Sequence, residues 1–454
     1  MRHLMPLIAT AAFSLNTAPT FADLGDQLFK LLADDSAAGD LFGNSVAISG
    51  TIAIVGAYGD DDNGAASGSA YLFDTTTGRQ VAKLLANDGA KGDFFGESVA
   101  ISGATAIVGA WANGDNGFQS GSAYLFSTTT GQQIAKLLPK DGFLYDWFGF
   151  SVAISGATAI VGAHGDGDNG LYSGSAYFFN AATGEQIVKL LPNDGAWSDA
   201  FGISVAISGD TAIVGAPYHD HNDTRYGAAY LFDTTTGRQI AELLSDDSAQ
   251  ADGFGRTVAI SGTTAIVGAS TDGDNGTASG SAYLFDTTTG RQLFKLLPDD
   301  GAEFDFFGKS VAISGATAIV GAYLDDDNGT NSGSVYLFDT TTGWQVAKLL
   351  ADDGTAFESF GIAVAISGAT GKETAIVGAI GDDDFSGSAY LFDAAAPGKC
   401  PWDLDGSGSV GAADLLDLLF NWGPCKGCPA DFDGSGSVAA SDLLTLLANW
   451  GPCP

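Results

Sequence analysis

A repeat of 53 residues runs through most of this 454-residue chain and constrains its fold more than any other feature. Each copy contains a Phe-Gly pair, a later Gly-Ala pair and a segment of the Gly-Ser-Ala-Tyr-Leu-Phe type. The phenylalanines of the seven Phe-Gly pairs are Phe42, Phe95, Phe148, Phe201, Phe254, Phe307 and Phe360. A fixed period of this length is typical of solenoids and propellers, in which each copy forms one supersecondary unit.

Each copy has the pattern of four short β-strands. In the first copy, apolar runs occupy residues 45–49, 52–57, 69–73 and 80–85. Valine, isoleucine, tyrosine and phenylalanine dominate these runs, turn residues separate them, and no helical periodicity links them. The first and second runs, and the third and fourth, are joined by connections short enough for hairpins. The copy therefore predicts a four-stranded antiparallel sheet.

The phase of the repeat predicts a closed ring. Residues 28–33 resemble a fourth strand without its first three, whereas the last copy has no fourth strand after Phe392. We therefore expect the N-terminal strand to complete the last sheet. Both faces of the strands are apolar, and in a propeller the neighbouring blades cover both faces. The sequence predicts an all-β, seven-bladed β-propeller over residues 23–396.

A lysine recurs in the predicted fourth strand of six sheets, and Glu242 replaces it in the remaining one. Charged side chains discourage exposed strands from pairing edge to edge with other molecules. The lysines therefore indicate that the fourth strand forms the outer edge of each blade.

These Phe-Gly and Gly-Ala motifs, in seven copies over residues 28–396, resemble the FG-GAP repeats of integrin α-subunit propellers and related bacterial secreted proteins. The resemblance implies a propeller with a binding or adhesion function. Calcium-binding members of that family carry an Asp-x-Asp-x-Asp-Gly loop between the Phe-Gly and Gly-Ala strands. Here that connection is a short Ser-Gly-Ala-Thr segment, as at residues 102–105, so we do not carry those calcium sites over.

Charge and the N-terminus indicate an exported protein. The chain has 54 acidic and 18 basic residues, and its net charge of −36 makes nucleic acid or an anionic membrane an improbable partner. Residues 1–22 have the pattern of a signal peptide, with Arg2 and His3 before an apolar core and small residues before the expected cleavage site. No other stretch is long and apolar enough to span a bilayer. We expect a secreted or cell-surface protein that does not span a membrane.

The C-terminal segment predicts a separate domain. Residues 397–399 form a linker, and residues 400–454 contain two copies of one segment with a step of 28 residues. All four cysteines lie in this domain: Cys400, Cys425, Cys428 and Cys453. Four cysteines in a short exported domain predict two disulfides, for which three pairings are open. We favour Cys400 with Cys453 and Cys425 with Cys428.

Each tail copy contains a candidate calcium loop of twelve residues. Oxygen-bearing side chains or carbonyls stand at positions one, three, five, seven and twelve, and a glycine stands at position six. The predicted calcium ligands are Asp403, Asp405, Ser407, Ser409 and Asp414 in the first loop and Asp431, Asp433, Ser435, Ser437 and Asp442 in the second. We expect Val410, at position eight, to pair with the other loop, and a helix to follow each loop at 415–422 and 443–450.

A duplicated loop and helix without an entering helix resembles a dockerin domain, and the resemblance covers residues 400–454. It implies calcium-dependent attachment to a cohesin-like or cell-surface partner. Two features depart from the pattern: position five is serine, and the segments end in Trp-Gly-Pro-Cys.

One face of the propeller is the predicted binding face. The connections between strands two and three, and between blades, emerge on the same face and vary most among the seven copies, and loops on a rigid scaffold often bind ligands. A protein or glycan is the expected ligand. The candidate anchors are Tyr58, Trp111, Tyr145, Trp147, His164, Trp197 and Tyr323. The alternative is that these rings pack beneath the long loops.

The loops between strands two and three are rich in aspartate, as in residues 60–64. A solvated turn is the simple interpretation, and alternate aspartates that gather calcium are the other. The fourth copy differs because His219 and His221 replace the aspartates. That change indicates either a polar loop or a transition-metal site.

Two functions fit these features. One is a non-catalytic binding or scaffold protein. The other is a polysaccharide-degrading enzyme, since dockerins often accompany glycosidases. Glycoside hydrolysis needs two carboxylates in different environments, whereas the acidic residues here repeat in nearly every copy. No Ser-His-Asp order or zinc signature appears either. We therefore expect a binding protein.

Overall fold

A computed structural model describes residues 24–221, 224–247, 251–369, 372–394, 409–424, 430, 437–448 and 451–452. The expected signal peptide (1–22), the linker (397–399) and all four cysteines lie outside the described residues. Six of the predicted calcium ligands also lie outside the described residues: Asp403, Asp405, Ser407, Asp431, Asp433 and Ser435. Only the backbone of Ser409 is described, whereas Asp414, Ser437 and Asp442 are described with their side chains.

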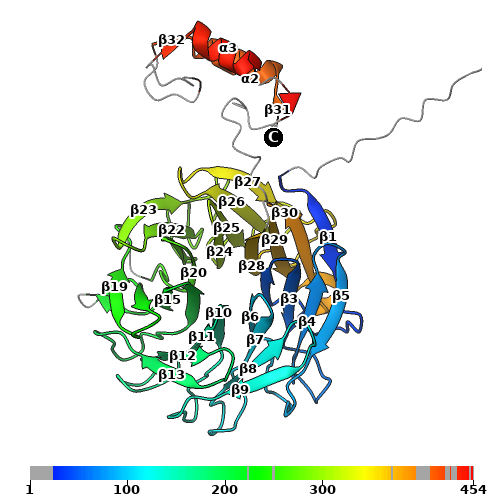
Figure 1. Ribbon diagram of the computed structural model, residues 1–454, viewed down its shortest axis with the longest axis vertical. Coiled ribbons are helices and arrows are strands. Elements are labelled where there is room, and N and C mark those ends of the chain that lie inside the picture. Colours follow the sequence, from blue (N-terminus) through cyan, green and yellow to red (C-terminus); the bar gives the residue numbers. More distant parts are fainter. Residues whose placement is uncertain are drawn as a thin grey trace, which may run out of the picture.

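Seven four-stranded antiparallel sheets are arranged in a ring (Figure 1). Blade one contains β2 (Ser45–Ser49), β3 (Ile52–Ala57), β4 (Ser69–Asp74) and β5 (Arg79–Leu84). Blade two contains β6 (Ser98–Ser102), β7 (Thr105–Ala110), β8 (Ser122–Ser127) and β9 (Gln133–Leu137). Blade three contains β10 (Ser151–Ser155), β11 (Thr158–Ala163), β12 (Ser175–Asn180) and β13 (Gln186–Leu190). Blade four contains β14 (Ser204–Ser208), β15 (Thr211–Ala216), β18 (Ala228–Asp233) and β19 (Gln239–Leu243), with a small hairpin of β16 (Asp220–His221) and β17 (Thr224–Arg225).

The remaining blades follow the same plan. Blades five and six contain β20 (Thr257–Ser261), β21 (Thr264–Ala269), β22 (Ser281–Asp286), β23 (Arg291–Leu296); and β24 (Ser310–Ser314), β25 (Thr317–Ala322), β26 (Ser334–Asp339), β27 (Gln345–Leu349). Blade seven contains β28 (Ala363–Ala369), β29 (Lys372–Ala379), β30 (Ser388–Asp393) and β1 (Gln27–Leu31), with the short turn α1 (Asp382–Phe385). The predicted all-β, seven-bladed propeller is confirmed.

The N-terminal strand closes the ring as predicted. Strand β1 pairs antiparallel with β30, with Lys30 opposite Tyr390 and Leu31 opposite Ala389. Two backbone hydrogen bonds extend the pairing, because Gly25 N donates to Asp393 O and Asp393 N donates to Asp26 O. Blade seven thus joins the two ends of the propeller.

The repeated Phe-Gly pair explains how the blades pack. In blade two, the Phe95 ring meets Tyr124 and Phe126 edge-on, with ring centroids 5.5 and 5.7 Å apart. Phe95 is buried in the interface with blade one, and burying a side chain of this size contributes about 1.5–3 kcal/mol. Gly96 follows with φ +95°, and a Cβ there would lie 2.2 Å from the Ser69 carbonyl oxygen. The glycine is required because neighbouring blades approach at this point.

The tail forms two helices around a small core. Helices α2 (Ala412–Phe420) and α3 (Ala440–Ala448) begin three residues earlier than expected. The reason is capping: the Asp414 carboxylate accepts a hydrogen bond from Gly411 N at 2.7 Å, which places Asp414 inside the first turn. The Asp442 carboxylate holds the N–H of Ala439 in the same way, at 2.8 Å.

The predicted pairing of the two tail loops is wrong. Strand β31 (Ser409–Val410) pairs with β34 (Gly451–Pro452), and β32 (Gly423–Pro424) pairs with β33 (Ser437–Val438). Each loop strand therefore pairs with the Gly-Pro segment that follows the helix of the other copy. Val410 and Val438 instead meet through their side chains, in a buried cluster with Leu418 and Leu446.

Within the described part of the chain, no helix is both long and apolar enough to cross a membrane.

Candidate functional site

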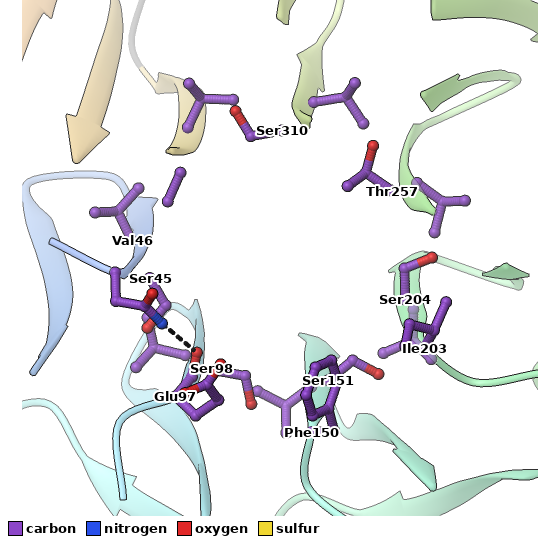
Figure 2. A pocket seen from close by; sticks show the side chains of 18 of the residues that line it. Ser45, Val46, Glu97, Ser98, Phe150, Ser151, Ile203, Ser204, Thr257 and Ser310 are labelled. Carbon is purple, nitrogen blue, oxygen red and sulfur yellow. Dashed lines mark hydrogen bonds between the residues drawn. The ribbon is translucent and has the colours of Figure 1, made fainter. Parts of the chain in front are cut away.

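A cavity of about 350 Å³ lies at the centre of the ring, at one end of the innermost strands. The first residues of these strands and the residues just before them line it, and Figure 2 shows Glu97 and Phe150 on neighbouring blades with Thr257 and Ser310 across the opening. Ser45 pairs with Gly56, so the loops that follow the second strands leave from the same end. The cavity therefore opens on the face where the variable loops gather.

A ring of hydroxyl groups fastens the blades around the cavity. Ser45 Oγ donates a hydrogen bond to Gly96 O of the next blade at 2.8 Å. Five further blades repeat this bond through Ser98, Ser151, Ser204, Thr257 and Ser310. Ala363 stands at this position in blade seven and has no hydroxyl. These hydroxyls are structural, because their protons are used between blades.

The rim of the cavity varies among the blades. It is formed by the residue that follows each Phe-Gly pair: Asn44, Glu97, Phe150, Ile203, Arg256, Lys309 and Ile362. None of these rim residues is among the anchors predicted from the sequence. The signal was available, because this position changes its chemistry from copy to copy while the Val-Ala-Ile-Ser residues after it stay the same.

The rim carries two cations on adjacent blades. Arg256 Nη1 donates a hydrogen bond to the Tyr218 hydroxyl at 3.1 Å, and Lys309 Nζ lies 5.7 Å from the centroid of the Tyr323 ring. Among the described residues, no carboxylate lies within ion-pair distance of Arg256 or Lys309. Burial, together with the charge of Arg256, lowers the pKa of the Lys309 ammonium.

Glu97 is the carboxylate among the residues that line the cavity. Burial raises its pKa to about 7, although the positive charge of Lys309 opposes the shift. Asn44 Nδ2 donates to the backbone carbonyl of Glu97 at 3.2 Å and fixes this part of the rim (Figure 2). The rim therefore combines two basic side chains with a glutamate whose pKa is raised by burial.

An arc of aromatic rings borders the rim on blades one to three. Phe94 stacks on Trp111 with centroids 5.3 Å apart, and Trp147 stacks on Tyr172 at 5.4 Å. Trp111 and Trp147 meet edge-on at 6.4 Å, and Tyr58 meets Phe94 at 5.8 Å. Stacked rings that keep one accessible edge or face suit a planar or sugar-like ligand.

The family-model comparison matches the repeat directly. A model described as FG-GAP repeat matches residues 26–73, 79–126, 132–179, 185–232, 238–285, 291–338 and 344–392, which is more than half of the chain. The chain belongs to the FG-GAP repeat family. Each matched FG-GAP unit starts with an outer strand and ends with the third strand of the next blade. No curated protein matches the chain.

Phe150 and His164 link the aromatic arc of this FG-GAP propeller to its rim. The Phe150 ring lies 6.4 Å from Trp111 and 4.4 Å from the His164 ring. His164 Nδ1 is buried and makes no hydrogen bond to the described residues. Burial and the charge of Arg256 lower the pKa of His164 to about 4, so its imidazole is neutral at pH 7.

The structure brings only some of the predicted anchors together. Trp111, Trp147 and His164 lie in the arc with Tyr58, whereas Tyr323 lies on the cationic side of the rim. The other two predicted anchors are far more exposed: Tyr145 is 42% exposed and contacts Phe118, and Trp197 is 60% exposed. Neither makes a ring contact with the arc in the described part of the chain.

The acidic loops of the FG-GAP blades are arranged around lysines. Lys83 Nζ lies 2.6 Å from Asp35, 2.9 Å from Asp60 and 2.7 Å from Asp62, and 5.2 Å from the centroid of the Tyr71 ring. Hydrogen bonds to these carboxylates outweigh burial and raise the pKa of Lys83. The Lys83 ammonium therefore lies between the aspartates, at the place where a calcium ion bound by this loop would lie. Five more lysines pair with aspartates in this way: Lys30, Lys136, Lys189, Lys295 and Lys348.

The structure describes the side chains of three predicted calcium ligands in the tail: Asp414, Ser437 and Asp442. Asp414 and Asp442, the twelfth loop residues, are fully buried and hold the backbone of their own loops. Carboxylates at this position serve both as helix caps and as metal ligands in calcium loops. Calcium binding by the tail stays a prediction.

Proposed function

We propose that this chain is a non-catalytic extracellular binding protein whose channel mouth binds a carboxylate-bearing saccharide. The observation that carries the proposal is the pair Arg256 and Lys309, two cations on the rim of a cavity in a protein of net charge −36. FG-GAP repeats are typical of extracellular proteins, and their propeller fold suggests a binding or adhesion role.

The contrast with the other lysines supports an anionic ligand. Lysines such as Lys83 are held by two or three aspartates in each of six blades. Lys309 has an aromatic ring and no carboxylate within ion-pair distance in the described chain. A bound carboxylate would supply the missing counter-charge and reverse the shift of the Lys309 pKa, and charge-assisted hydrogen bonds are among the strongest that proteins make.

The aromatic arc and the size of the cavity favour a saccharide over a protein partner. A cavity of about 350 Å³ is at the lower end of the range for small-ligand sites. Phe150 lines the cavity, and its ring contacts Trp111 and His164. His164 in turn contacts Trp147. Such rings stack on the apolar faces of sugar rings, while Arg256 and Lys309 on the other side of the rim receive the carboxylate.

Binding is a better fit than hydrolysis. A glycosidase acts with two carboxylates, one as acid and one as base or nucleophile. The cavity lining contains the single carboxylate of Glu97. We therefore propose recognition without cleavage, and we propose that the dockerin-like tail attaches the propeller to a partner in a calcium-dependent manner.

The test is a binding screen with immobilised polysaccharides. Polygalacturonate and alginate should retain the full chain in the presence of calcium, and the same polymers after carboxyl reduction should not. The variant Arg256→Gln/Lys309→Gln should lose at least about tenfold in affinity, since each charge-assisted bond contributes about 1.5–3 kcal/mol.

The matched control is Arg238→Gln/Arg291→Gln, which removes the same charge from exposed positions beside the outer hairpins. Retention lost equally in both variants would show that general charge, and not the rim, drives binding. Retention of an acidic peptide instead of the polysaccharides would replace the saccharide with a protein partner. Release of reducing sugar during incubation would favour the hydrolase.

A further inference from the structure

The fourth blade departs from the other six at one charged cluster. In blade one, Asp60 of the second loop contacts Lys83 of the outer strand, and Asp35 of the preceding loop completes the cluster. In blade four, His219 replaces the aspartate and Glu242 replaces the lysine, while Asp194 is kept. The loop position and the strand position have changed together, so the substitution concerns one site.

The geometry of this site differs from an ion pair. His219 is buried, with 4% of its surface exposed. Its Nε2 lies 3.8 Å from an Asp194 oxygen and 3.7 Å from a Glu242 oxygen. These distances are too long for hydrogen bonds. In blade one, by contrast, the Lys83 ammonium approaches its three aspartates to 2.6–2.9 Å.

The three side chains are close enough to share one metal ion after a small movement. Zinc binds nitrogen and carboxylate oxygen at about 2.0–2.2 Å, so two ligands of one tetrahedral ion lie about 3.3–3.6 Å apart. One ligand atom from each of Asp194, His219 and Glu242 lies within 4.8 Å of the others. Imidazole nitrogen and carboxylate oxygen are both ligands that zinc accepts in proteins.

The surroundings of His219 fit a metal ligand as well. Its Nδ1 lies 3.1 Å from the carboxylate of Asp199. A hydrogen bond from Nδ1 to a carboxylate leaves Nε2 as the free lone pair, and metal-binding histidines are commonly oriented in this way.

The sequence of this loop contains a second histidine. His221 stands where Asp62 stands in the first copy, so the fourth copy has two histidines in place of two aspartates.

We propose that blade four binds a divalent transition-metal ion of the zinc class through Asp194, His219 and Glu242, with Asp199 orienting the histidine. The ion takes the place of the lysine ammonium of the other blades. It neutralises the two carboxylates and ties the loop of blade four to its outer strand, as Lys83 does in blade one.

The test uses the full chain with its tail sites saturated with calcium. The variant His219→Asp/Glu242→Lys restores the aspartate–lysine pair found in five of the other blades, so it should fold normally. Titration calorimetry with zinc should show one more bound ion per chain in the wild type than in this variant. Zinc should also raise the melting temperature of the wild type and leave that of the variant unchanged.

Cobalt gives an independent readout, because its visible absorption reports the ligands. One wild-type cobalt ion should show the spectrum of nitrogen and oxygen ligands, and His219→Gln should lose it. Equal zinc uptake by the wild type and the restored variant would overturn the proposal. A wild type that takes up no zinc would overturn it as well.

Discussion

Glu97 provides a quantitative test of the rim. Burial raises its pKa from 4.5 to about 7 in the folded protein. One pKa unit corresponds to about 1.36 kcal/mol, so a shift of about 2.5 units corresponds to about 3 kcal/mol of folding free energy. The change we consider is Glu97→Gln, which keeps the shape of the side chain and removes its titration.

The sign follows from proton binding. Between pH 4.5 and 7, the folded state holds the proton and the unfolded state does not, so the stability of the wild type falls as the pH rises. This contribution is present in full below pH 4.5 and is lost as the pH passes 7. Glu97→Gln should therefore match the wild type at pH 4.5 and exceed its free energy of unfolding by up to about 3 kcal/mol at pH 8.

The assay is urea denaturation of both proteins at pH 4.5, 6, 7 and 8. The difference between the two proteins removes the contributions of other titrating groups, such as Asp146 and Asp305, whose pKa values burial raises to about 6. A difference in stability that stays constant across this pH range would refute the reasoning, because it would mean that Glu97 is not held protonated by its surroundings.

Three further predictions follow from the fold, the tail and the loop face. Deletion of residues 23–35 removes β1 and leaves blade seven with three strands, so we expect aggregation or a clearly lower melting temperature, and an unchanged melting curve would contradict the closure. The full chain should bind about two calcium ions through its tail, and Asp403→Ala/Asp431→Ala should abolish that binding; calorimetry without calcium uptake by the wild type would argue against the tail sites. Trp111→Ala/Trp147→Ala should weaken binding of the acidic saccharide by about 2 kcal/mol, whereas Thr76→Ala/Thr129→Ala on the opposite hairpins should not, and the reverse outcome would move the site to the other face.

The fold could be predicted from the sequence because the same pattern of strands and turns recurs in seven copies, and each copy supports the same interpretation. The closure by β1 could be deduced from the phase of the repeat alone, since a fourth strand before the first Phe-Gly pair needs a partner. The start of helix α2 was placed too late, because the carboxylate of Asp414 serves as a cap as well as standing at the last loop position.

Contacts between distant positions could not be deduced in the same way. Lys83 was interpreted as an edge charge, but its partners Asp35 and Asp60 lie on different loops, and the side chain folds over Tyr71. The rim is a different case. Arg256 and Lys309 stand at equivalent positions of consecutive copies, so the predicted ring already placed them on neighbouring blades, and the structure adds the cavity that both of them line.

The most direct test of the central claim is a calorimetric titration of a defined galacturonate oligosaccharide into the full chain at low salt. We predict saturable binding with one site per propeller, at least about tenfold weaker in Arg256→Gln/Lys309→Gln, and no binding of the corresponding neutral galactose oligosaccharide. Equal affinity for the acidic and neutral oligosaccharides, or equal affinity of the wild type and this variant, would contradict the account.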